Sequence, residues 1–150
     1  MKQVFLLVIL TAIWEASSVV ANTNNTRGKE DGLINPVTPR SFVRVTNLLN
    51  EGLPFTIHCK SRDDDLGAHD VSNKGTYQWS FHRNIFGTTL FFCGIHWRDG
   101  SMVYDVYKAS RDIDRCFTNC YWEVTNNALI GYTQKPFKQD IQVPWQKPKN

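Results

Sequence analysis

Strong net charge and long apolar runs are both missing from this chain of 150 residues. Its 17 Lys and Arg against 14 Asp and Glu leave a formal net charge of only +3, which gives no case for nucleic acid as a partner. Beyond the N-terminal segment, no apolar stretch is long enough to span a bilayer. We therefore expect a mature chain that neither binds nucleic acid nor inserts into a membrane.

Catalytic and metal-binding motifs are missing as well. The sequence has no Gly-rich phosphate loop, no Gly-X-Ser-X-Gly and no His-Glu-X-X-His. His58 precedes Cys59, but adjacent strand residues point to opposite faces, so the two cannot form a nucleophile pair. The spacing of Asp63–Asp65 is not that of a calcium loop, and Cys116-X3-Cys120 lacks a second pair of zinc ligands. We expect no enzyme activity, no cofactor and no metal.

The N-terminus has the order of features typical of an export signal. Lys2 precedes an apolar stretch from Val4 to Trp14, and small residues end at Ala21. We predict a signal peptide over 1–21 and a secreted, extracellular mature chain. Residues 22–40 are polar and read as a flexible arm, in which Asn24-Asn25-Thr26 predicts a glycosylation site at Asn24.

Cysteine is scarce, and an even count in an exported chain favours disulfides. Four cysteines allow three pairings, and sequence alone does not choose among them. We favour Cys59–Cys120 with Cys93–Cys116, which would tie an early strand to the last core strand. A local Cys116–Cys120 bridge, which leaves Cys59 and Cys93 to pair, stays open. The four cysteines are Cys59, Cys93, Cys116 and Cys120.

Apolar residues alternate with polar ones from residue 41 onward, which is the pattern of half-buried strands. The runs are short, rich in aromatic and β-branched residues, and separated by turn residues; Asp99-Gly100 is a tight hairpin signal. We predict an all-β fold: an antiparallel β-sandwich of about seven or eight short strands over 41–132, with a closed barrel as the alternative. Residues 133–150 are rich in Pro and Lys and read as a flexible, weakly basic tail.

Two charged segments are the candidate partner-binding sites, because loops on a rigid sheet scaffold commonly carry recognition. The first combines the charged run at 62–65, an arginine followed by three acids, with a nearby histidine, and we expect one of these acids to cap the turn. The second is a charged connector at 111–115. The candidate residues are Arg62, Asp63, Asp64, Asp65, His69, Arg111, Asp112, Asp114 and Arg115.

Several segments in order resemble one known family. They are Val43-Arg44-Val45-Thr46-Asn47-Leu48, His58-Cys59-Lys60-Ser61, Tyr77-Gln78-Trp79-Ser80-Phe81, Thr89-Leu90-Phe91-Phe92-Cys93 and Cys116 to Trp122. Together they resemble the plant self-incompatibility S1 family, the S-protein homologues. One departure is Asn126-Asn127-Ala128, where the family often has an acid or Asn followed by Gly.

The resemblance implies a secreted β-sandwich with disulfides and no catalytic residues. The family takes its name from pistil proteins that act as ligands for a pollen receptor and trigger rejection of self pollen. It therefore implies a monomeric signalling ligand for a cell-surface receptor, in self-incompatibility or in other cell–cell signalling. The alternative is a secreted defence protein that binds microbial or anionic surfaces through the basic tail and exposed aromatic residues such as Trp145.

Overall fold

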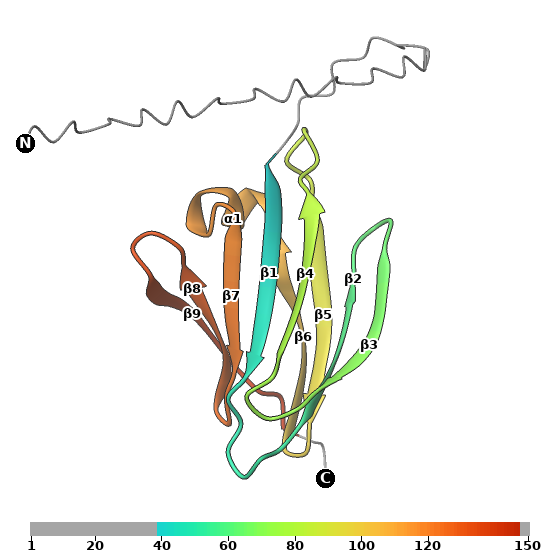
Figure 1. Ribbon diagram of the computed structural model, residues 1–150, viewed down its shortest axis with the longest axis vertical. Helices are drawn as coiled ribbons and strands as arrows, with labels where there is room; N and C mark the ends of the chain where they lie inside the picture. Colours follow the sequence, from blue (N-terminus) through green and yellow to red (C-terminus); the bar gives the residue numbers. More distant parts are fainter. Residues whose placement is uncertain (1–38, 148–150) are drawn as a thin grey trace, which may run out of the picture. The chain divides into compact units, whose positions relative to one another are not determined.

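The computed structural model describes residues 39–147, which form two β-sheets and one short helix (Figure 1). The predicted signal peptide, Asn24 and nearly all of the polar arm lie outside these residues. The elements in chain order are β1 (Arg40–Asn47), β2 (Phe55–Lys60), β3 (Asp65–Val71), β4 (Thr76–His82), β5 (Leu90–Trp97), β6 (Gly100–Lys108), α1 (Ala109–Arg115), β7 (Asn119–Val124), β8 (Ala128–Thr133) and β9 (Lys138–Pro144).

The two sheets confirm the predicted sandwich rather than a single closed barrel. One sheet has the order β4-β1-β7-β8-β9 and the other the order β3-β2-β5-β6. The expected hairpin joins β5 to β6, with its turn at Arg98-Asp99, one residue earlier than predicted, because Gly100 already pairs with Trp97. In Figure 1 the strands β1 and β4 of the five-stranded sheet lie in front of β6, and β8 and β9 lie at the left.

The core lies between the sheets and is built by period-two alternation. Val43 and Val45 of β1 and Ile57 of β2 are fully buried, and Trp122 of β7 is 1% exposed. Each fully buried side chain of this size contributes roughly 1.5–3 kcal/mol to folding. The alternation therefore assigns one face of each central strand to packing and leaves the other face available for contacts outside the core.

One strand pair departs from the antiparallel expectation. β1 and β7 are parallel neighbours, with Val43 opposite Cys120 and Val45 opposite Trp122. Parallel neighbours need a long crossover connection, and here the chain between them forms β2 to β6 and then α1. Sequence alternation cannot reveal this pairing, because it reports the faces of a strand and not the direction of its neighbour.

The prediction of a flexible tail at 133–150 is wrong for most of the part that the structure describes. β9 pairs with β8, and its Ile141 and Val143 pack against the core. Trp145 then donates its indole N–H to the carbonyl of Thr125 at 2.8 Å, and its ring meets that of Trp97 edge-on. The folded domain therefore extends past residue 132, and Trp145 is not an exposed aromatic residue available for surface binding.

The favoured disulfide pairing is also wrong. The bridges are Cys59–Cys93 and Cys116–Cys120, which is the alternative that the sequence left open. Cys59 and Cys93 stand directly opposite each other on the neighbouring strands β2 and β5. Cys120 lies on β7, in the other sheet, and bonds instead to the cysteine at the end of α1.

Candidate functional site

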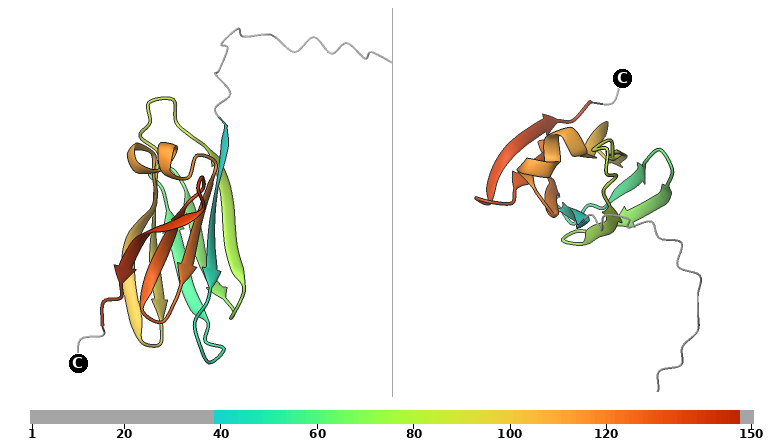
Figure 2. Two further views of the ribbon diagram at one scale, coloured as in Figure 1. Left: turned by 90° about the vertical axis from the view of Figure 1, so that its left-hand side faces the viewer. Right: turned by 90° about the horizontal axis from the view of Figure 1, so that it is seen from above.

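A groove of about 500 Å³ opens at the end of the sandwich where the β2–β3 turn and the β4–β5 loop lie. Figure 1 and the left view of Figure 2 place both connections at the same end as α1. Three segments supply most of its walls: 61–64 from the β2–β3 turn, 84 and 88–89 from the β4–β5 loop, and 90–92 from β5. Phe81 and His82 at the end of β4 complete the lining.

The β2–β3 turn is fixed by its own hydrogen bonds. The hydroxyl of Ser61 accepts the backbone N–H groups of Asp63 at 3.2 Å and Asp64 at 2.9 Å, and the N–H of Ser61 donates to the carbonyl of Asp64 at 2.8 Å. In such a turn the serine hydroxyl accepts the backbone N–H groups, so the side chains of the next residues are not needed to cap them. The turn therefore presents Arg62, Asp63 and Asp64 as exposed charges on the rim of the groove.

Asp65 has a structural role that its neighbours do not share. Its carboxylate contacts Nε2 of His58 at 2.5 Å and Nζ of Lys60 at 2.9 Å, both on β2. It also accepts the N–H of Gly67 at 3.0 Å, where φ is +75°, so the expectation that an acid caps this turn is confirmed. The bond from His58, then that from Lys60, holds the pKa of Asp65 well below its usual range.

The β4–β5 loop adds apolar side chains that the sequence analysis missed. Ile85 is 62% and Phe86 80% exposed. Asn84 organises the loop: its side-chain oxygen accepts the N–H of Phe86 at 2.6 Å, and its N–H donates to the hydroxyl of Thr89 at 2.7 Å. An apolar pair between Asn84 and Gly87, two turn residues, was the available signal.

The second predicted segment is not a solvated loop. Residues 111–115 belong to α1, and Asp112 is fully buried. Asp112 accepts the backbone N–H of Lys108 at 2.7 Å, two bonds from Arg111 at 2.9 and 2.7 Å, and one from Arg115 at 3.2 Å. A buried carboxylate needs such partners, so Asp112 is committed to holding the helix in place.

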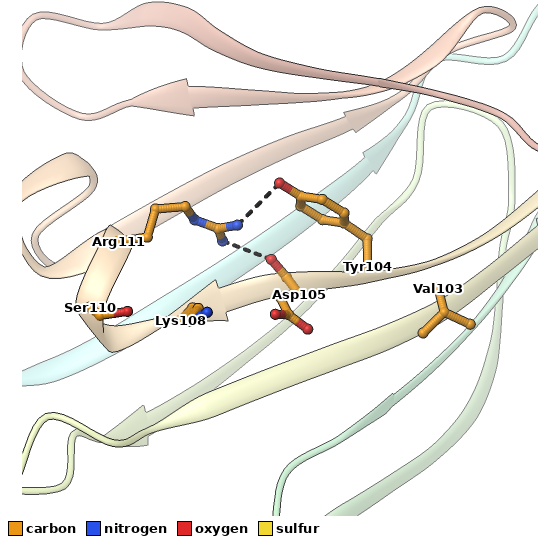
Figure 3. A pocket seen from close by; sticks show the side chains of 6 residues that line it. All are labelled: Val103, Tyr104, Asp105, Lys108, Ser110 and Arg111. Atoms are coloured by element: carbon orange, nitrogen blue, oxygen red, sulfur yellow. Dashed lines mark hydrogen bonds between the residues drawn. The ribbon is translucent and has the colours of Figure 1, made fainter.

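Both arginines of this segment pair with Asp112 and help to hold the helix in place. Arg115, whose side chain is 7% exposed, also pairs with Asp140 of β9 at 2.6 Å. Arg111 donates to the hydroxyl of Tyr104 at 3.1 Å and to the carbonyl of Asp105 at 2.7 Å (Figure 3). Burial is the largest influence on the Arg111 guanidinium and opposes its charge, but the bond to Asp112 raises its pKa overall.

The structure therefore separates the predicted binding residues into two groups. Arg62, Asp63 and Asp64 line one groove. Arg111 borders a different hollow of about 440 Å³, with Val103, Tyr104, Asp105, Lys108 and Ser110 (Figure 3). His69 stacks on Tyr77 at 4.3 Å between ring centroids and is not part of the groove lining. Of the residues in the α1 segment, Asp114 is the exposed acid.

One group of potential metal ligands occurs within residues 39–147. Atoms of Asp112, Cys116 and Cys120 lie within 4.8 Å of one another. However, the two sulfurs form a disulfide, and the carboxylate already bonds two arginines. Metal ions bind thiolates rather than disulfide sulfurs, so this arrangement does not suit a cation.

Comparison with known proteins now identifies the family. Residues 42–145 match the family model described as plant self-incompatibility protein S1. This chain belongs to that family. The match includes β9 and Trp145, in agreement with their place in the folded domain.

Individual relatives support the assignment. The chain is 36% identical to S-protein homolog 6 of Arabidopsis thaliana over 78% of its own length and 85% of the relative's. It is 42% identical to S-protein homolog 24 of the same plant, over 71% of each chain. Both alignments span most of the folded domain.

A solved structure shares the fold. It belongs to the self-incompatibility protein homologues, described as a widespread family of small, highly stable, secreted proteins from plants, and matches with a TM-score of 0.52 at 19% identity. The match covers 74% of this chain and 93% of that one. Among the residues that the present structure describes, no helix is long and apolar enough to cross a membrane.

Proposed function

We propose that this protein is a secreted recognition ligand that binds a cell-surface receptor protein through the groove between the β2–β3 turn and the β4–β5 loop. Family membership supports a small secreted plant protein. The export signal predicted at 1–21 supports the same compartment. The role is binding, in self-incompatibility or in another form of cell–cell signalling, and not catalysis.

The observation that carries the proposal is the composition of this groove. The exposed charges of Arg62, Asp63 and Asp64 line it together with the exposed apolar side chains of Leu90 and Phe92. Ile85 and Phe86 lie on the β4–β5 loop between lining residues Asn84 and Thr88, and both are more exposed still. Protein interfaces combine an apolar anchor that is buried on binding with a charged rim that selects the partner. The loops are held by internal hydrogen bonds, which lowers the entropic cost of ordering them on binding.

The test measures binding of the fluorescently labelled, oxidised protein to intact plant cells. Binding should be saturable, blocked by unlabelled protein and lost when cell-surface proteins are removed with protease. Phe86→Ala and Asp64→Lys should each weaken it by about tenfold or more, since truncation of an anchor typically costs more than ~1.4 kcal/mol. Leu48→Ala is the matched control, because Leu48 is also an exposed apolar residue, at 43%, and lies after β1 at the other end of the sandwich.

The outcomes against the proposal are specific. Binding that survives protease treatment, or that falls equally with Leu48→Ala, would place recognition elsewhere. Arg111 is unsuitable as a test site for this surface, although the sequence alone suggested it. Its reversal to Glu would set a second carboxylate against buried Asp112 and unfold the helix region rather than report on binding.

Binding to anionic or microbial surfaces is the second candidate function. The formal net charge of +3 and exposed Lys135, Lys138 and Lys147 support it. Deleting the segment would remove β9, so neutralisation of these lysines to Gln is the better test. Receptor binding should persist in that variant, whereas binding to anionic vesicles would fall and be sensitive to salt.

A further inference from the structure

A continuous row of planar side chains crosses the outer face of the five-stranded sheet. The pairing registers place Arg44 opposite Gln78 of β4 and opposite Tyr121 of β7, and place Tyr121 opposite Tyr132 of β8. Tyr132 is in turn opposite Gln139 of β9. Laterally paired residues point to the same face of a sheet. Because the neighbouring β1 residues Val43 and Val45 are fully buried, this row points away from the core.

The row is held rigidly by contacts among its own members. Arg44 donates to Gln78 at 3.0 Å, to the hydroxyl of Tyr121 at 2.9 Å and to Asn119 at 3.2 Å. Its guanidinium carbon lies 5.4 Å from the centre of the Tyr121 ring. Tyr132 donates to Glu123 at 2.5 Å, and burial together with this bond raises the pKa of Tyr132 to about 12.

A third aromatic ring extends the surface at the β8–β9 turn. Phe137 stacks on Tyr132 with ring centroids 5.0 Å apart and 1° between the planes, and meets Tyr121 edge-on at 5.6 Å. Phe137 is nevertheless 63% exposed. A large apolar ring that is held in a fixed orientation and left open to solvent is a feature of binding surfaces.

The chemistry of the row selects a ligand class. Sugar rings present apolar C–H faces, which stack on aromatic rings, and a rim of hydroxyls, which bond to amide and guanidinium groups. The three hydrogen-bond acceptors of Arg44 are all uncharged, so none of these bonds neutralises its positive charge. The carboxylate on the same face, that of Glu123, accepts the hydroxyl of Tyr132. Arg40, at the start of the same strand β1, is exposed and contacts Ser80. A guanidinium whose charge is not neutralised can bind a carboxylate through two parallel hydrogen bonds, in a planar bidentate pair.

We propose that this face, defined by Gln78, Arg44, Tyr121, Tyr132 and Phe137, binds an acidic oligosaccharide that contains uronic acid residues. The aromatic rings stack on sugar faces, and Arg44 pairs with a uronate carboxylate. The site is separate from the groove and does not depend on the proposed receptor. Since the contacts lie on the outer face of a sheet, we expect each to be weak, and a repeating polysaccharide would gain by offering many equivalent sites.

The test is an NMR titration of the oxidised, ¹⁵N-labelled protein with an oligomer of α-1,4-linked galacturonic acid. The matched ligand control is the same oligomer with its carboxylates methyl-esterified. The backbone amides of Tyr121 and Tyr132 and the Nε signal of Arg44 should shift with the acidic oligomer. The esterified oligomer should bind at least about fivefold more weakly, because it lacks the charge.

Variants separate a built site from general attraction between charges. Phe137→Ala and Arg44→Gln should each weaken binding by about fivefold or more, with melting temperatures close to wild type. Arg44→Lys keeps the charge but loses the planar fork, so it should also weaken binding. Phe86→Ala is the protein control: it should impair receptor binding and leave the sugar unaffected, and Phe137→Ala should do the reverse.

Four results would overturn the proposal. They are an absence of shifts with the acidic oligomer, shifts that cluster in the groove instead, equal binding of the esterified oligomer, and wild-type binding by Arg44→Lys. The wild-type shift map does not depend on any variant folding, so the proposal can be refuted from that measurement alone.

Discussion

At the scale of single residues, the main lesson concerns charge. The sequence presents 111–115 as two acids flanked by two arginines, which is typical of a solvated connector. The structure buries the central carboxylate completely and places arginines on both sides of it. Gly131 adds to this arrangement, because a Cβ there would lie 2.5 Å from the Arg115 guanidinium and 2.6 Å from the Trp122 ring. No pattern along the chain predicts such a cluster, since its partners come from α1, β6, β7, β8 and β9.

Asp112→Asn is therefore expected to destabilise the fold. It leaves two arginines, one of them almost buried, without their shared counter-charge, and breaking a buried pair in this way costs about 3 kcal/mol or more. The free energy of unfolding from urea titration measures the loss. Asp114→Asn is the matched control, because Asp114 is an exposed acid two residues further along the same helix. This substitution should change the free energy of unfolding by less than ~0.5 kcal/mol. Equal effects of the two substitutions would contradict the structural role of Asp112.

At the scale of elements, alternation predicted the strands that have a buried face and missed the others. The strands β2 and β5 could be predicted from the sequence, because apolar residues recur in them at every second position. β3 was not, because six of its seven residues are exposed or partly exposed, as befits an edge strand that resists pairing with other chains. β9 was readable in principle from Ile141 and Val143, but the surrounding lysines and prolines suggested a tail.

Truncation tests the place of β9. A chain that ends at Phe137 loses the strand, the packing of Trp145 and the partner of Arg115 at Asp140. We expect it to lose about 4 kcal/mol or more, since each of its apolar side chains contributes up to roughly 1.5–3 kcal/mol, and to show a lower or absent cooperative thermal transition. A chain that ends at Lys147 keeps all these contacts and should melt like the full chain. Near-identical melting temperatures of the two truncated chains would show that residues 138–147 contribute little to the fold, which would contradict this role of β9.

At the scale of the whole molecule, the sheets and the two disulfides form a scaffold that displays loops at one end. The Cys59–Cys93 bridge closes a chain separation of 34 residues and the Cys116–Cys120 bridge one of 4; chain entropy assigns about 4 and about 2 kcal/mol to them. The sequence correctly predicted the sandwich, and the candidate residues at 62–64 line the groove of the proposed recognition site. It did not single out the second segment of that proposed site, at 84–89, because an apolar pair in a loop has no periodicity.

An exchange of loops tests the central claim most directly. Residues 61–64 and 84–89 of this chain are grafted together onto S-protein homolog 24, which is 42% identical, and binding of the graft to the cells used above is measured by competition with the labelled parent. If the two loops carry recognition, the graft should compete with the parent within about tenfold of its affinity, while unaltered homolog 24 competes poorly. If the graft folds with its own melting transition and still fails to compete, whereas this chain with the loops of homolog 24 competes normally, recognition resides in the sheets and the account is wrong.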